Sequence, residues 1–278
     1  MTNARIRTLA PSEVETLIDW AAAEGWNPGE QDATALRPAD PDGFLGAFVD
    51  GEMVAGISAI SYGTAFGFIG LYICRPDMRG KGFGKTVWDA GMTRLAGRTL
   101  GLDGVPEQQA NYRAMGFVPA YRTFRYSGTI AAPASGSANV QPVSPGMLPM
   151  LEDFDRAFFP APRAAFLQGW LSAPHIALVC MEGETVLGYG VARRCREGAK
   201  IGPLFAAEQA TAGMLLSELS LRCDCEIHID VPETSGSFAD TLLRQGMSKG
   251  FETMRMYRGP TPALRSDGIF GITTLELG

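Results

Sequence analysis

Hydrophobic and polar positions change period several times along the first half of the chain. An apolar side chain recurs every three or four residues between positions 11 and 23, which predicts an amphipathic helix. Three apolar segments bounded by glycine-containing turns predict strands, at residues 44–49, 53–62 and 66–74. A helical period returns at 85–95, followed by strand, helix and strand patterns at 99–103, 107–115 and 120–126. This order predicts an α/β unit with a βαβ crossover at its centre.

The same order of patterns recurs in the second half of the chain. The turn and strand DGEMVAG at residues 50–56 reappear as EGETVLG at residues 182–188. Further on, Leu102-Asp103 is matched by Ile229-Asp230, and Gly116-Phe117 by Gly250-Phe251. Three matches in the same order predict an internal duplication. Small and helix-breaking residues without periodicity predict a linker at 129–139, between units at 1–128 and 140–278.

A glycine-rich loop, RGKGFG at residues 79–84, lies between the apolar strand 66–74 and the helix 85–95. Glycine lets the backbone approach a ligand closely, and amide groups at a helix N-terminus bind phosphate. The loop is not a Walker loop, because Arg79 stands where that motif needs glycine. It is not the dinucleotide fingerprint either, because Lys85 stands where that motif needs its last glycine.

The pattern that fits is R/Q-x-x-G-x-G/A, with Arg79, Gly82 and Gly84 at its fixed positions. In this feature, and in NYRAMGF about 30 residues further on, the sequence resembles the GNAT superfamily of acyl-coenzyme A-dependent acetyltransferases. The resemblance implies an α/β (α+β) fold of two tandem GNAT-like domains, each a mixed, mostly antiparallel sheet flanked by helices. The second copy has Ala206–Thr211 in place of the loop, with a carboxylate and no glycine, so we expect one cofactor site.

The resemblance also implies which residues bind acetyl-coenzyme A. They follow the strand, the loop, the start of the next helix and the helix before Gly116. The expected set is Ile73, Cys74, Arg79, Gly80, Lys81, Gly82, Phe83, Gly84, Lys85, Thr86, Asn111 and Arg113.

Acetyl transfer to an amine needs a proton acceptor for the amine and a proton donor for the leaving thiolate. In the family, a tyrosine four residues before the Gly-Phe often protonates the thiolate, and Tyr112 has this spacing from Gly116. The alternative is that Tyr112 only packs against the cofactor. No carboxylate occurs in residues 68–74, so Asp103 is the candidate base; binding a cationic amine or capping a turn are its alternatives.

The acceptor side is predicted near the loop after the first helix. Trp26, Asn27 and Tyr72 are the candidate substrate-binding residues, and a hydrophobic plug is the alternative for the aromatic side chain of Trp26. The second copy is expected to narrow the cleft, which favours a small-molecule amine as acceptor. A non-catalytic acyl-coenzyme A sensor and a protein N-acetyltransferase are the other candidate functions.

Composition limits the other possibilities. The chain has 278 residues, 46% of them apolar, and a formal charge of −6, which argues against nucleic acid as the partner. No apolar run is long enough to cross a membrane, and the N-terminus lacks the apolar core of a signal peptide, so a cytoplasmic protein is expected. Five cysteines without CxxC spacing and two distant histidines predict no disulfide framework and no metal site. A monomer or a homodimer is expected.

Overall fold

The computed structural model describes residues 4–130 and 139–278. The first half contains the five strands and three helices that the patterns predict, several of them with shifted ends. The order is β1 (Arg5–Thr8), α1 (Pro11–Ala23), α2 (Asp32–Leu36), β2 (Phe44–Val49), β3 (Glu52–Tyr62), β4 (Phe66–Cys74), α3 (Phe83–Arg94), β5 (Thr99–Gly104), α4 (Gln109–Ala114) and β6 (Val118–Gly128). The predicted helix at 11–23 is confirmed. The helix predicted at 85–95 begins two residues earlier, and β1 and α2 had no clear pattern.

The second half repeats this arrangement. Its elements are β7 (Val140–Pro142), α5 (Leu148–Asp155), α6 (Ala164–Trp170), β8 (Ile176–Glu182), β9 (Thr185–Arg194), β10 (Ala199–Ala206), α7 (Gln209–Cys223), β11 (Ile227–Pro232), α8 (Gly236–Arg244), β12 (Ser248–Arg258) and β13 (Ile269–Gly271). In both halves a parallel strand pair, β4–β5 or β10–β11, is connected by a helix, while the remaining strand pairs are antiparallel. The predicted mixed, mostly antiparallel sheet with flanking helices is confirmed.

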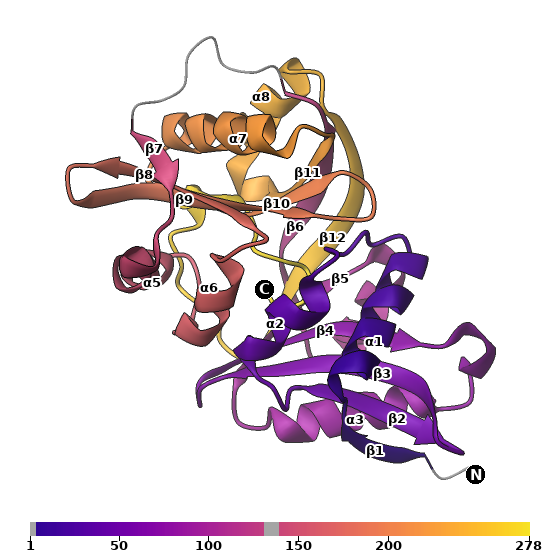
Figure 1. Cartoon of the computed structure of the whole chain (residues 1–278). Helices are drawn as coiled ribbons and strands as arrows, with labels where there is room; N and C mark the ends of the chain where they lie inside the picture. The colour runs from indigo at the N-terminus through magenta and orange to yellow at the C-terminus, as the bar shows by residue number, and fades with distance from the viewer. Residues whose placement is uncertain (1–3, 131–138) are drawn as a thin grey trace.

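The two halves exchange their last strands. Strand β12 of the second half pairs with β5 of the first, and β6 of the first pairs with β11 of the second. Because β6 and β12 also pair with each other, the strands form one continuous sheet in the order β1-β2-β3-β4-β5-β12-β6-β11-β10-β9-β8-β7. Figure 1 shows β12 running from the second half toward β5. The predicted unit limits at 128 and 140 stay predictions, and most of the predicted linker lies outside the described residues.

The C-terminal segment fills the space where the second parallel pair separates. β10 and β11 pair only at residues 199–201 and 227–229, and β13 then pairs with β10 at Leu204 and Phe205. The amide of Ile272 donates to the carbonyl of Asp230 at 3.0 Å. Only Ala207 and Glu208 connect β10 to α7, whereas residues 75–82 connect β4 to α3. The second copy therefore has neither the long loop nor an open gap between its parallel strands.

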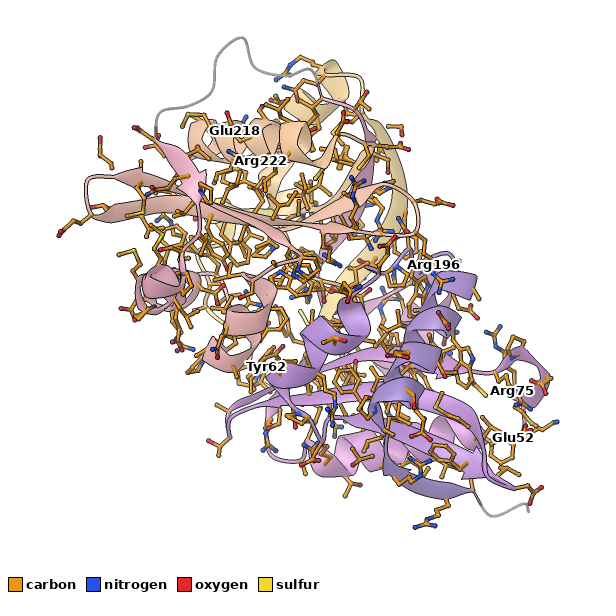
Figure 2. The ribbon with its side chains drawn as sticks, in the orientation of Figure 1. Glu52, Tyr62, Arg75, Arg196, Glu218 and Arg222 are labelled. Atoms are coloured by element: carbon orange, nitrogen blue, oxygen red, sulfur yellow. The ribbon has the colours of Figure 1, made fainter. Side chains whose placement is uncertain are left out.

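The segment then continues into the first half, where its last residues are buried. The hydroxyls of Ser58 and Tyr62, both on β3, donate to the carbonyls of Glu276 and Leu277 at 3.1 Å each. Tyr62 lies where the two halves meet (Figure 2). A Cβ atom at Gly70 would overlap the carbonyl oxygen of Glu276, so glycine is required for this close approach. The residues after β13 thus join the halves next to β4.

Candidate active site

The glycine-rich loop ends at the first turn of α3. Gly80 and Gly82 have φ angles of +75° and +88°, and Gly82 is the N-cap of the helix. A side chain would strain both positions, although an added Cβ would meet no atom within 4 Å. Within the described residues, the amides of 80–83 donate to no backbone acceptor. Free amides in a left-handed turn at a helix N-terminus are suited to bind a phosphate group.

An open cleft of about 750 Å³ begins beside this loop. Arg79 lines the cleft, and its Nε donates to the carbonyl of Cys74 at 3.0 Å while its other end forms an ion pair with Glu24. Ile73 and Cys74 also line it, and burial raises the pKa of the Cys74 thiol. The cleft continues past Tyr72 to the loop after β5.

Strands β4 and β5 separate at the inner end of the cleft. Their parallel pairing runs from Phe66 and Thr99 to Ile69 and Leu102 and stops there. Leu71 has a φ of +46°, and the pairing of β4 with β3 shifts register next to it. This bulge bends β4 away from β5, and the remaining residues of β4 face a gap.

A narrower inner pocket of about 60 Å³ occupies this gap. Four aromatic side chains contribute to its walls: Trp26, Tyr72, Tyr112 and Phe251. Its polar lining residues are Asp103, Gln108, Thr253 and Glu276. The inner pocket shares Trp26, Tyr72, Val105, Gln108 and Phe251 with the cleft, so the two form one continuous site.

Tyr112 on α4 lies where the sequence pattern predicts a proton donor. Its ring stacks on Trp88 of α3, with centroids 5.6 Å apart, and its side chain lines the inner pocket. Within residues 4–130 and 139–278 its hydroxyl forms no hydrogen bond. Burial raises the pKa of Tyr112, so the phenol stays protonated at neutral pH. The position of Tyr112 is suitable for donating a proton into the pocket, and its catalytic role stays a prediction.

Asp103 lines the same pocket but has a partner that the sequence pattern did not indicate. Its two carboxylate oxygens accept hydrogen bonds from Nε and Nη2 of Arg255, each at 2.8 Å. Burial raises the pKa of Asp103, while the guanidinium of Arg255 acts in the opposite direction. Because β12 carries Arg255 and β5 carries Asp103, this pair connects the exchanged strand to the first half. Asp103 is therefore not a free carboxylate, because both of its oxygens are engaged by Arg255.

Two of the three predicted substrate-binding residues line the site, and the third lies outside it. Trp26 and Tyr72 line both the cleft and the inner pocket. Asn27 does not line either of them: its amide group donates to the carbonyl of Glu197 at 2.9 Å and accepts from the amide of Glu197 at 3.1 Å. Asn27 therefore fixes the loop after α1 to the β9–β10 turn of the second half, a contact that local sequence patterns do not encode.

The remaining predicted cofactor residues surround the start of α3 and α4. Lys85 forms an ion pair with Asp89 on the next helical turn, and the hydroxyl of Thr86 donates to the carbonyl of Gly82. Lys81 is exposed beside Met78, and Asn111 donates to the side chain of Gln108 at 2.9 Å. Phe83 is buried and Arg113 is exposed. None of these six side chains lines the cleft described above.

Four residues of the pocket come from the second half and were not predicted as site residues: Phe251, Thr253, Leu275 and Glu276. Phe251 belongs to the Gly-Phe pair that marks the duplication, which was the one available signal. Thr253 lies on the exchanged strand β12, and Leu275 and Glu276 lie in the C-terminal segment. The structure thus brings the second half into the predicted acceptor side.

Within residues 4–130 and 139–278, no group of three or more His, Cys, Asp or Glu side chains could hold a metal ion. No helix in these residues is both long and apolar enough to cross a membrane.

Comparison with known proteins gives matches over both halves. A family model described as acetyltransferase (GNAT) family matches residues 12–118, and one described as acetyltransferase (GNAT) domain matches residues 151–271. Holothin acyltransferase of Pseudoalteromonas sp. (strain SANK 73390) is 32% identical over 269 residues, covering 96% of this chain and 92% of that protein. The uncharacterized N-acetyltransferase YitH of Bacillus subtilis (strain 168) is 23% identical over 280 residues, covering 97% of each.

Solved structures show the same fold. The crystal structure of a Pyrococcus horikoshii protein, provisionally called an acetyltransferase, matches with a TM-score of 0.83 at 24% identity. The match covers 100% of this chain and 97% of that one. The Pyrococcus protein therefore has both halves in the same arrangement, and the match spans nearly its whole length.

Proposed function

The chain belongs to the GNAT family of acetyltransferases, and we propose that it transfers the acetyl group of acetyl-coenzyme A to the primary amine of a small-molecule acceptor. The observation that carries this proposal is the run of free amides at 80–83, beside a cleft that leads to Tyr112. Amides that lack an acceptor are an energetic cost unless water or a ligand binds them. A diphosphate group fits this requirement, and a pantetheine arm fits the cleft.

The acyl group would then lie where β4 and β5 separate. The amine nitrogen attacks the thioester carbon, the carbon–sulfur bond breaks, and the nitrogen loses a proton while the sulfur gains one. The protonated phenol of Tyr112 supplies the proton to sulfur. Asp103 remains a candidate acceptor for the amine proton, directly or through water, but its pairing with Arg255 gives it a competing structural task. Holding both reactants in one site makes covalent catalysis unnecessary.

The small inner pocket supports a metabolite-sized acceptor over a protein chain, because aromatic side chains and the C-terminal segment enclose it. The relative that is 32% identical is named for acyl transfer to holothin, so holothin belongs in the acceptor panel beside simple primary amines. We expect the protein to act in the cytoplasm as a monomer or homodimer.

Calorimetry with coenzyme A tests the binding step, with two matched glycine variants. Gly82 and Gly97 have φ angles of +88° and +81°, and an added Cβ meets no atom within 4 Å at either. Glutamate at each position brings a similar backbone strain of about 1–2 kcal/mol. Gly82→Glu should abolish coenzyme A binding, since it adds bulk and negative charge at the phosphate site, whereas Gly97→Glu, in the turn before β5, should keep it.

Equal binding by both variants, or no binding by the wild type, would remove the proposed site. Release of free thiol from acetyl-coenzyme A across the amine panel tests the transfer itself. Binding without turnover of any acceptor would favour the sensor function instead.

A further inference from the structure

Two polar groups at the inner end of the pocket have no hydrogen-bond partner. They are Oγ1 of Thr253 and Oε2 of Glu276, and both residues are only 2% exposed. Both line the inner pocket. A buried carboxylate oxygen without a hydrogen bond is unfavourable even beside a cation, so its position in a pocket favours a ligand that donates to it.

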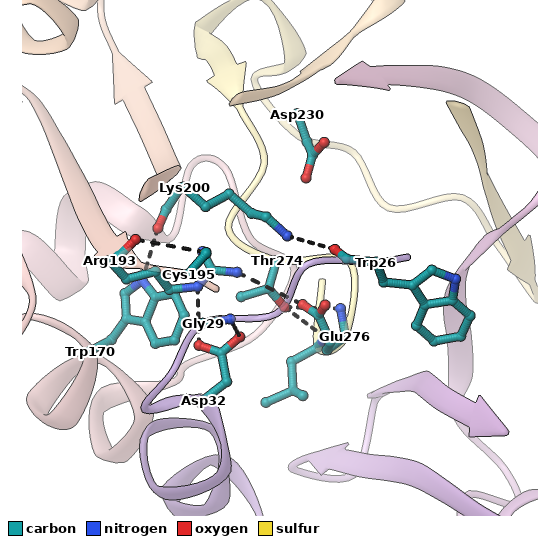
Figure 3. Close-up of polar contacts among 12 residues, drawn as sticks. Trp26, Gly29, Asp32, Trp170, Arg193, Cys195, Lys200, Asp230, Thr274 and Glu276 are labelled. Atoms are coloured by element: carbon teal, nitrogen blue, oxygen red, sulfur yellow. Dashed lines mark hydrogen bonds and ion pairs between the residues drawn. The ribbon is translucent and has the colours of Figure 1, made fainter. Parts of the chain in front are cut away.

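Of the cations around Glu276, Arg125 is satisfied by another carboxylate, whereas no side-chain nitrogen of Arg193 has a hydrogen-bond partner among the described residues. Arg125 donates to both oxygens of Asp230, at 2.8 and 2.9 Å. Arg193 has its Nε 3.1 Å from Asp32, and its Nη2 is 4.0 Å from Oε2 of Glu276, which exceeds hydrogen-bond distance. Figure 3 shows the carboxylate of Glu276 between Arg193 and Trp26.

The remaining cation near Glu276 is Lys200. Its Nζ donates to the carbonyl of Trp26 at 3.1 Å, and burial lowers the pKa of this amine. In Figure 3 the side chain of Lys200 runs toward Trp26. In the described part of the chain, no Arg or Lys donates a hydrogen bond to Oε2 of Glu276, although Arg193 forms an ion pair with it at 4.0 Å. Of the three carboxylates in this cluster, Asp32, Asp230 and Glu276, Glu276 is the one that lines the pocket.

The backbone of Glu276 is fixed independently of its side chain. Its carbonyl accepts from Ser58 at 3.1 Å, and its amide donates to Oγ1 of Thr274 at 3.0 Å. The close contact with Gly70 also involves only the carbonyl. The hydrogen bonds that fix this part of the C-terminal segment use the backbone of Glu276, while its carboxylate is a counter-ion of Arg193 and lines the pocket.

We propose that Glu276, assisted by Thr253, binds the nitrogen of the acceptor, so that the C-terminal segment of the second half selects the substrate. An ionised carboxylate only accepts hydrogen bonds, while a threonine hydroxyl can also accept, so the pair suits a group with several N–H donors such as a primary ammonium. The aromatic rings of Trp26 and Phe251 would contact an apolar, planar part of the same molecule. This inference rests on the proposed function, because it assigns the acceptor end of that site.

Two probes of matching shape test the proposal: benzylamine, which is cationic at neutral pH, and benzyl alcohol. We expect the wild type, with coenzyme A present, to bind benzylamine more tightly in calorimetry. Glu276→Gln should weaken benzylamine binding by about 10- to 100-fold, the range of one hydrogen bond to a charged group, and leave benzyl alcohol unchanged. Thr253→Val should weaken it by about 2- to 10-fold. Neither change should alter the coenzyme A affinity.

Asp32→Asn is the matched control, because Asp32 belongs to the same charged cluster and faces the same Arg193 but does not line the pocket. It should keep the preference for benzylamine. The proposal is overturned if the wild type binds neither probe or both equally, if Glu276→Gln keeps the preference, or if Asp32→Asn loses it to the same extent. Thermal melting of each variant detects loss of folding, and if Glu276→Gln does not fold, Thr253→Val decides the result.

Failure of the proposed acetyltransferase function can be distinguished from failure of the proposed role of Glu276. A wild type that binds benzylamine through Glu276 but does not bind coenzyme A keeps this inference and removes the enzymatic one. If Glu276→Gln turns over an acceptor normally with an unchanged KM, the enzymatic function is kept and the role of Glu276 in acceptor binding is removed.

Discussion

Asp103→Asn is expected to destabilise the protein strongly, because it would leave the guanidinium of Arg255 buried and without a carboxylate. The Asp103 side chain is 0% exposed and that of Arg255 is 7% exposed, and two hydrogen bonds of 2.8 Å join them. Burial alone would lower the pKa of Arg255, yet Asp103 and two neighbouring tyrosines raise it well above its ordinary value, so it stays charged. Aromatic rings remain near it: the centroids of Phe68 and Tyr121 lie 5.0 and 5.8 Å from the guanidinium carbon.

The cost follows from the burial. Breaking a buried ion pair by removing one partner costs about 3–5 kcal/mol. For a chain of this size each kcal/mol lowers Tm by roughly 2–4 °C, so a fall of roughly 6–20 °C is expected. Removing both charges, in Asp103→Leu combined with Arg255→Met, should return stability to within about 2 kcal/mol of the wild type, because apolar residues of similar volume often replace buried pairs without loss.

Thermal and urea unfolding followed by circular dichroism measure both variants. A melting temperature of Asp103→Asn within about 2 °C of the wild type, or a double variant as unstable as the single one, would exclude a stabilising role of the pair. If Asp103→Asn loses kcat while its stability stays unchanged, Asp103 serves as the proton acceptor and the structural interpretation of the pair is wrong.

Three further outcomes follow from named contacts. Tyr112→Phe should lower kcat by about 100-fold or more, the usual range for a lost proton donor, with unchanged coenzyme A affinity; full activity would exclude its role. Burial lowers the pKa of His228, so stability is present above the ordinary pKa of about 6.5 and is lost as pH falls below it, and His228→Gln should flatten the dependence of Tm on pH between about 7 and 5. Gly70→Ala should displace the carbonyl of Glu276 and cost about 1–3 kcal/mol in unfolding experiments, and a wild-type Tm would contradict that close contact.

Features that depend on neighbouring residues in the chain could be predicted from the sequence. The helix at 11–23 and the loop at 79–84 follow from a 3.6-residue period and from glycines that allow positive φ. The missing loop in the second copy could also be predicted, because residues 206–211 contain no glycine and carry a carboxylate. That only two residues connect β10 to α7 was seen in the structure. Tyr112 and Tyr72 line the pocket because their strand and helix are placed by these local signals.

Contacts between distant segments were decided by the tertiary structure alone. Strands β6 and β12 descend from the same repeated pattern, so each has the alternation that β5 and β11 require, and the sequence does not say which one pairs with which. The exchange brings Arg255 to Asp103 and Thr253 to the pocket. Glu276 reaches the pocket only because β13 fills the gap beside β10 and directs the chain back to β3 and β4. Periodicity and glycine placement act over a few residues, whereas strand partners and buried ion pairs depend on packing of the whole chain.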